Sequence, residues 1–196
     1  HSIISVWNGS TWSTLGTGLD RSWVWPGSGR RAFTMCSFDE DGTGPKLPSL
    51  FVGGTFYQSS DGVLSPLVIR WQKDHSTGTA GWIPIPSPPQ LYAQASGDAC
   101  STNCANTPTR PDRPRVLSMM PFDIDSAGQP AMYIGGDLRT TGGYFQGIMR
   151  WNPADNTTEW VNNATGGNFT AQPFTMLVVP ATGSVPARLV MGTGYT

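Results

Sequence analysis

Residues 50–56 (LFVGGTF), 132–138 (MYIGGDL) and 189–195 (LVMGTGY) are three short apolar runs, and each is closed by glycine. Another apolar element precedes each of them, at residues 33–38, 116–122 and 174–180. Each unit also holds a pair of tryptophans: Trp7 with Trp12, Trp71 with Trp82, and Trp151 with Trp160. Self-similarity at a spacing of several tens of residues predicts a repeat protein.

The apolar runs have the character of β-strands. They are short, rich in β-branched and aromatic residues, and bounded by Gly, Pro, Asp and Asn. No segment sustains a helical apolar period over three turns, so we expect almost no helix. Each unit is interpreted as four strands: an inner strand such as residues 116–120, a glycine-ended strand such as residues 131–135, and the two arms of a tryptophan hairpin. The expected fold is all-β, and four strands is the count of one β-propeller blade.

The composition agrees with a turn-rich all-β protein. Among 196 residues there are 24 glycines and 17 prolines, and 13% are charged where about a quarter is usual. The net charge is −1 and the basic residues are scattered, apart from Arg110, Arg113 and Arg115, so we expect no nucleic-acid partner. No stretch approaches the roughly 18 apolar residues that a membrane span needs. The length suits a single structural unit over residues 1–196.

One unit resembles a known repeat closely. Residues 135–138 (GGDL), 141–143 (TGG) and 148–151 (IMRW), followed by Trp160, are similar to the repeat of kelch-type β-propellers in secreted and cell-surface proteins. In that repeat a glycine pair follows a hydrophobic run, and an Arg-Trp pair and a second Trp come later. The resemblance covers nearly the whole chain. It implies a propeller fold and specifies no activity.

Counting strands along the chain divides one unit between its two ends. We predict a half blade at about residues 1–16, complete blades at about 33–82 and 116–161, and a half blade at about 173–196, with an insertion loop at about 83–115. Three blades are too few to close a propeller, since known closures use about four to eight. An open arc exposes unpaired strand edges.

Two explanations for the divided unit stay open. The chain is a piece of a longer propeller, or the half blade of one copy is completed by the half blade of the next. The second arrangement is head-to-tail, and it gives a ring or a filament. We favour self-assembly, with other copies of the chain as partners.

Four Asn-x-Ser/Thr sequons predict N-glycans and a secreted or cell-surface location. Three of the four are crowded between residues 156 and 170. Their acceptor asparagines are Asn8, Asn156, Asn163 and Asn168. The first residue is His1, which suggests processing or excision from a longer protein.

Cysteine usage agrees with an oxidising environment. Cys100 and Cys104 bracket a short polar turn and are predicted to close a small disulfide ring, with two reduced thiols as the alternative. Cys36 lies in an apolar run and is expected to be a buried small hydrophobe.

The turns after the inner strands are acidic. Asp39, Asp41, Asp123 and Asp125 are explained by tight turns, in which Asp bonds its own backbone. A calcium site is the sharper alternative, because carboxylates two residues apart resemble the start of an oxygen-ligand loop. No other cofactor is expected.

The repeated glycines and tryptophans have packing explanations. Blade-end glycines are expected where backbones approach closely; they are Gly53, Gly54, Gly135, Gly136 and Gly192. Trp12, Trp82 and Trp160 are expected at matching places, as plates between neighbouring blades, with sugar stacking as the alternative.

Catalytic motifs are not recognised. His1 and His75 are the only histidines, and neither a Ser/His/Asp set nor a phosphate-binding glycine loop occurs. Paired carboxylates drawn from Asp20, Asp61, Asp74 and Asp137 leave hydrolysis as an alternative. The kelch resemblance brings a copper radical oxidase into consideration, but its tyrosine, cysteine and histidine ligands have no match here.

The sequence therefore predicts a non-enzymatic, extracellular, glycosylated structural protein that assembles with itself. A carbohydrate- or protein-binding module of a larger surface protein is the first alternative. A secreted oxidase or hydrolase is the second.

Overall fold

The described part of the chain is built from strands alone. The computed structural model describes residues 4–19, 31–42, 44, 46–56, 58–65, 67–73, 80–85, 115–123, 130–138, 147–161 and 171–194. Within these ranges there is no helix, and the strands form four antiparallel sheets. The all-β prediction is thereby confirmed. These strands form neither a closed barrel nor a closed propeller, so the propeller interpretation stays a prediction.

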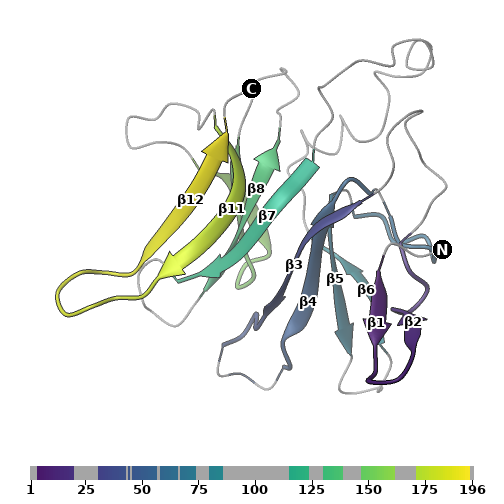
Figure 1. Cartoon of the computed structure of the whole chain (residues 1–196). Coiled ribbons are helices and arrows are strands. Elements are labelled where there is room, and N and C mark those ends of the chain that lie inside the picture. The colour runs from purple at the N-terminus through teal and green to yellow at the C-terminus, as the bar shows by residue number, and fades with distance from the viewer. Residues whose placement is uncertain are drawn as a thin grey trace, which may run out of the picture.

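Two sheets have four strands and two are hairpins (Figure 1). The N-terminal hairpin consists of β1 (Ser5–Trp7) and β2 (Trp12–Thr14). The first sheet consists of β3 (Ala32–Phe38), β4 (Ser49–Gly54), β5 (Val68–Lys73) and β6 (Ala80–Pro84). The second sheet consists of β7 (Arg115–Phe122), β8 (Ala131–Asp137), β9 (Ile148–Asn152) and β10 (Thr157–Trp160). The C-terminal hairpin consists of β11 (Gln172–Val179) and β12 (Arg188–Gly194).

The four sheets lie side by side in chain order, like the ribs of a fan (Figure 1). Within each four-stranded sheet the strands also follow chain order, so every connection joins neighbours. The predicted insertion at residues 83–115 is too long at both ends, because Ile83 belongs to β6 and Arg115 to β7. Residues 86–114 of that insertion lie outside the described residues.

The same irregularity recurs at the start of β3, β7 and β11. Pairing with the neighbouring strand skips Phe33 in β3, Leu117 in β7 and Phe174 in β11. The residue after each skipped position pairs with a glycine of the next strand: Thr34 with Gly53, Ser118 with Gly135, and Thr175 with Gly192. A bulge that recurs at one register position marks the three units as structural repeats.

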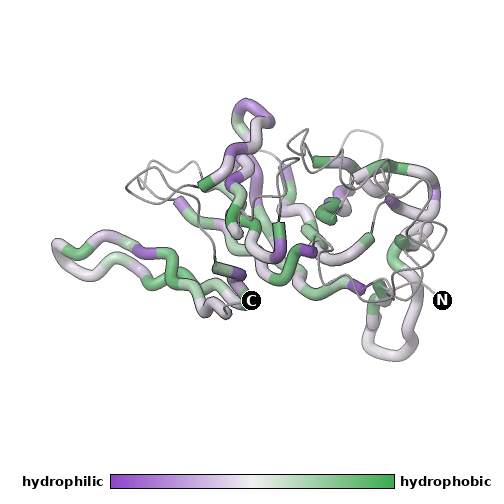
Figure 2. Tube along the Cα trace, turned by 90° about the horizontal axis from the view of Figure 1, so that it is seen from above, coloured by the Kyte–Doolittle hydropathy of each residue, from purple (hydrophilic) through white to green (hydrophobic). Residues whose placement is uncertain are grey.

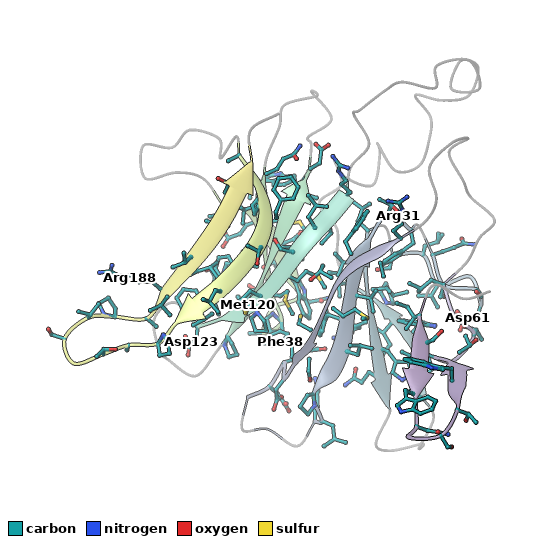
Figure 3. The ribbon with its side chains drawn as sticks, viewed as in Figure 1. Arg31, Phe38, Asp61, Met120, Asp123 and Arg188 are labelled. Atoms are coloured by element: carbon teal, nitrogen blue, oxygen red, sulfur yellow. The ribbon has the colours of Figure 1, made fainter. Side chains whose placement is uncertain are left out.

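Three apolar clusters fill the spaces between successive sheets. The first, with Leu19, Val52 and Trp82, lies between the first sheet and the N-terminal segment. The second, with Phe51, Met132 and Trp151, lies between the two four-stranded sheets. The third, with Tyr133 and Met176, lies between the second sheet and the C-terminal hairpin. Phe38 and Met120 point into the second and third of these spaces (Figure 3).

The glycine-ended strands are covered on both faces of the sheet, which explains why their apolar runs are continuous. Neighbouring residues of a strand point to opposite faces. Accordingly Phe51 belongs to the cluster toward the second sheet, and Val52 to the cluster toward the N-terminal segment. All seven residues of β8 are buried. A short continuous apolar run is the sequence pattern of such a doubly covered strand.

Polar and aromatic contacts also join the two four-stranded sheets. The guanidinium carbon of Arg70 lies 5.7 Å from the ring centroid of Trp151. The same guanidinium forms an ion pair with Glu40, in the turn after β3. The rings of Phe51 and Trp151 lie 5.4 Å apart. A cation over an aromatic face and tilted ring pairs both stabilise the contact beyond the buried area.

Gly136 is a sensitive position in this framework. A Cβ atom there would meet the backbone carbonyl oxygen of Arg115 and lie 3.0 Å from the amide nitrogen of Leu117. We expect Gly136→Ala to lower the free energy of unfolding by about 1–3 kcal/mol, because backbone must shift to make room. Gly81→Ala is the matched strand control, since a Cβ at Gly81 meets nothing within 4 Å. Urea unfolding of both variants checks the difference, and equal stability would contradict it.

Candidate assembly interface

Strands β1 and β12 each lack one neighbour that their counterparts have. In the four-stranded sheets the second strand pairs with the third: β4 with β5, and β8 with β9. By register, β12 is the counterpart of β4 and β8. The Trp7–Trp12 pair of the N-terminal hairpin matches the Trp71–Trp82 pair of β5 and β6, the third and fourth strands. Among the described strands, β12 pairs only with β11 and β1 only with β2. The two hairpins thus correspond to the first two and the last two strand positions of a four-stranded sheet.

The outer face of the C-terminal hairpin is apolar and exposed. Leu177 is 62% exposed, and Val179 and Val190 are exposed as well. Their counterparts in the first sheet are Cys36, Phe38 and Phe51, which lie against the cluster between the two four-stranded sheets. Figure 2 shows the hairpin extending away from the rest of the chain, with hydrophobic segments recurring along it. Side chains that the repeat normally buries are therefore uncovered here.

The first sheet has a matching uncovered position on its opposite face. Met35 in β3 is 57% exposed, whereas its counterparts Met119 and Met176 are 4% and 6% exposed. Met119 is covered because it packs between the two four-stranded sheets, and Met176 because it packs on the second sheet. Met35 lies opposite Val52, on the face toward the N-terminal segment, and no complete sheet precedes the first one in the described chain.

The tryptophans of the N-terminal hairpin are exposed too. The rings of Trp7 and Trp12 lie 5.4 Å apart and are tilted by 42°. Trp7 is 49% exposed, whereas its counterpart Trp151 is 1% exposed beneath Arg70. Trp12 is 70% exposed, so its predicted packing between blades is wrong for the isolated chain. The physical reason is that, among the described strands, no complete sheet lies against this face of the hairpin.

The predicted equivalence of Trp160 with the other two tryptophans is also wrong. Trp12 lies opposite Trp7 and Trp82 opposite Trp71, but Trp160 lies opposite Met149. It still packs against the cluster between the four-stranded sheets, while Trp82 is buried in the cluster next to the N-terminal segment.

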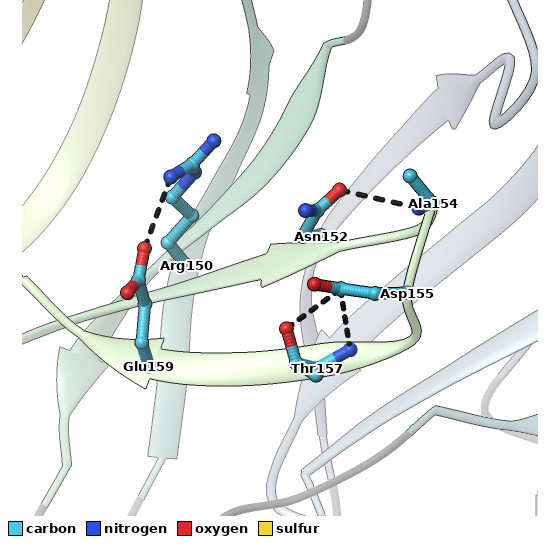
Figure 4. A network of polar contacts seen from close by, with 6 residues as sticks. All are labelled: Arg150, Asn152, Ala154, Asp155, Thr157 and Glu159. Atoms are coloured by element: carbon cyan, nitrogen blue, oxygen red, sulfur yellow. Dashed lines mark hydrogen bonds and ion pairs between the residues drawn. The ribbon is translucent and has the colours of Figure 1, made fainter.

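The turn between β9 and β10 places Trp160 two residues beyond the position opposite Trp151. The Asn152 side chain accepts a hydrogen bond from the amide of Ala154 at 3.2 Å. The Asp155 carboxylate accepts from the amide and the hydroxyl of Thr157 at 3.1 and 2.6 Å (Figure 4). These hydrogen bonds fix a four-residue turn, which places Thr158 opposite Trp151. They also hold the pKa of the Asp155 carboxyl below its usual value, chiefly through the Thr157 hydroxyl.

The blade-end glycines divide into two kinds. Cβ atoms at Gly54 and Gly136 would meet backbone oxygen within the same sheet, at Arg31 and Arg115. Cβ atoms at Gly53 and Gly135 would meet side chains of the next unit, and the one at Gly53 would also meet Thr34 of its own sheet. A Cβ at Gly192 would meet only Thr175, in its own hairpin. At Gly54 and Gly136 the close approach is therefore to backbone, and at Gly53 and Gly135 it is to side chains.

Two sequon asparagines lie in exposed hairpin turns. The Asn8 side-chain oxygen accepts from the amides of Ser10 and Thr11, both at 2.9 Å. Asn156 has a φ of 59°, and its side-chain oxygen accepts from the Trp151 indole at 3.3 Å. Both asparagines are exposed. Asn163 and Asn168 lie outside the described residues, and glycosylation stays a prediction at all four.

The acidic turn residues do not gather around a metal position. Within the described ranges no three His, Cys, Asp or Glu side chains are placed to hold a metal ion together. The Asp41 carboxylate instead accepts a hydrogen bond from the amide of Lys46 at 3.1 Å. Asp39 and Asp123 are described and Asp125 is not. The turn explanation therefore has support at Asp41, and the calcium alternative has none among the described residues.

The cysteines fall into two groups. Cys100 and Cys104 lie outside the described residues, so their disulfide stays a prediction. Cys36 is a free thiol whose sulfur lies 3.8 Å from that of Met132. Burial raises the pKa of this thiol to about 12.

Comparison with protein families, with curated proteins and with solved structures finds no match to this chain. In the part of the chain that the structure describes, no helix is long and apolar enough to cross a membrane.

Cys36 offers a test of the inter-sheet packing. The thiolate is the reactive form, and a pKa of about 12 leaves almost none of it at pH 8. We expect iodoacetamide to modify Cys36 of the folded chain far more slowly than Cys36 of the urea-unfolded chain, and the rate to rise as pH increases toward 12. Mass spectrometry of the peptide containing Cys36 measures this. Equal rates in the folded and unfolded chain would show that the space between the sheets is open.

Proposed function

We propose that this chain is an extracellular, glycosylated structural protein whose copies join head to tail, each joint completing a four-stranded sheet. The observation that carries the proposal is the complementarity of the two hairpins. The C-terminal hairpin supplies the first and second strands of a sheet, and the N-terminal hairpin supplies the third and fourth. Addition of a strand to an open edge gains backbone hydrogen bonds along its whole length.

The internal sheets give the register of the proposed joint. In them Phe51 lies opposite Arg70, and Tyr133 opposite Arg150. Transferred to the hairpins, this register sets Val190 of one copy opposite Val6 of the next. Met191 then lies opposite Ser5, and Leu189 opposite Trp7.

Exposed aromatic surface supports the same joint. Arg70 of the first sheet covers Trp151 of the second. If the same contact is repeated one unit later, Arg150 of one copy lies over Trp7 of the next copy. Arg150 lies near the surface, in an ion pair of 3.0 Å with Glu159, and Trp7 is half exposed. Contact between copies would bury the Trp7 indole, as the Trp151 indole is buried inside the chain.

The outcome of repeated joining depends on the rotation between copies. Each copy contributes two complete sheets and two halves, so two copies would make six blades, within the range of closed propellers. A rotation that does not close gives a filament. The exposed sequons at Asn8 and Asn156, in turns at hairpin ends, support an extracellular glycoprotein because a glycan there would stand clear of the strands.

The mass in solution tests assembly itself. The chain has a mass of 21.0 kDa. We expect light scattering to give a mass that rises with concentration to two copies or more. Leu177→Lys should reduce the association constant at least about tenfold, because joining would bury an unpaired charge. Leu47→Lys is the matched control, since Leu47 is similarly exposed but lies in the turn before β4. A mass of one chain at every concentration would refute self-assembly.

Disulfide trapping tests the register. Directly opposed side chains on adjacent strands are close enough for a disulfide, most readily at non-hydrogen-bonded pairs. Opposed pairs alternate between the two kinds, so both Val6→Cys/Val190→Cys and Ser5→Cys/Met191→Cys are made. We expect one of them to form ladders of linked copies on non-reducing gels. Ser5→Cys/Val190→Cys, with side chains on opposite faces, should not. Linkage in this control alone would exclude the register.

A further inference from the structure

A methionine packs on a glycine at the contact between the two four-stranded sheets. Gly53 near the end of β4 faces the second sheet. A Cβ atom at Gly53 would lie 3.1 Å from the Met119 sulfur and 2.5 Å from a Val116 methyl carbon. Because glycine has no Cβ, the Met119 side chain can reach the backbone of β4. Met119 is thereby almost completely buried.

The same contact recurs one unit later. Gly135 in β8 faces the C-terminal hairpin. A Cβ atom at Gly135 would collide with the terminal methyl group of Met176, and it would lie 2.8 Å from the Pro173 Cβ. Met176 is 6% exposed. Two independent copies of one arrangement show that the glycine of each unit receives the methionine of the next.

Within one chain, the third glycine of this kind, Gly192, and the third methionine, Met35, make no such contact. Gly192 in β12 has the same register as the first two, since it pairs with Thr175 as Gly53 pairs with Thr34. A Cβ at Gly192 would meet only the Thr175 methyl group, at 2.9 Å. Met35 has the same register as Met119 and Met176, each one residue after the residue paired with glycine. Met35 is 57% exposed.

We infer that Met35 of one copy packs on Gly192 of the preceding copy. The inference rests on the proposed head-to-tail assembly and names the face-to-face contact that accompanies the completed sheet. The exposed side chains of Leu177 and Val190 lie on the hairpin face that this contact would cover, as their counterparts Cys36 and Phe51 are covered inside the chain. Methionine suits such a contact because its flexible side chain follows the glycine surface closely.

The two partners are tested from both sides. Met35→Ala removes the side chain that fills the contact, and Gly192→Val fills the space that receives it. We expect each variant to weaken association by about thirtyfold or more in sedimentation equilibrium, by analogy with loss of buried methionines from protein interiors. Leu47→Ala is the control for Met35→Ala, because Leu47 is 54% exposed and lies outside the predicted contact. This control should leave association unchanged.

A second measurement separates this inference from the assembly itself. Urea unfolding of dilute, monomeric Met35→Ala should match that of the parent chain, because Met35 is exposed within one copy. The disulfide trap at the completed sheet is then repeated in the Met35→Ala background. If the parent chain associates and the trap forms, but neither Met35→Ala nor Gly192→Val changes the association constant, the Met35–Gly192 contact is wrong and sheet completion stands. If the parent chain does not associate, both proposals fail together.

Discussion

Burial on both faces is the constraint on which the two four-stranded sheets depend. Their strands carry large apolar side chains on both sides, and these pack into clusters with the neighbouring sheet or segment. This constraint sets the continuous apolar runs, the clusters between sheets and the glycine that admits a methionine from the next unit. It also explains why the molecule has a uniform order of strands, because each new unit must present the same pair of faces.

The inner contact between the two four-stranded sheets shows how the requirement is met. Trp151 lies against Phe51 and beneath Arg70, which are paired neighbours in the first sheet, while Arg70 is held by Glu40. A buried aromatic ring, a guanidinium over its face and a carboxylate that fixes the guanidinium form one connected layer. In the described chain the two terminal hairpins lack part of this layer. Trp7 and Leu177 are exposed for that reason.

Much of this arrangement could be predicted from the sequence, and the remainder depended on register. The glycine-ended runs and paired tryptophans were enough to predict an all-β fold, because their lengths and boundaries are local properties. The position of Trp160 was not predictable in the same way. Its partner across the hairpin depends on which four residues form the turn, and the hydrogen bonds that the Asn152 and Asp155 side chains accept decide that. The pairing of Met119 with Gly53 joins residues far apart in the chain, so no local pattern could indicate it.

The two outer faces of the described chain are chemically different. One presents Leu177, Val179 and Val190 around a glycine, and the other presents Met35 beside a tryptophan hairpin. A row of such copies would have direction, with a receiving end and an inserting end that cannot substitute for one another. A molecule that mimics only one face would therefore stop growth at a single end and leave the opposite end competent.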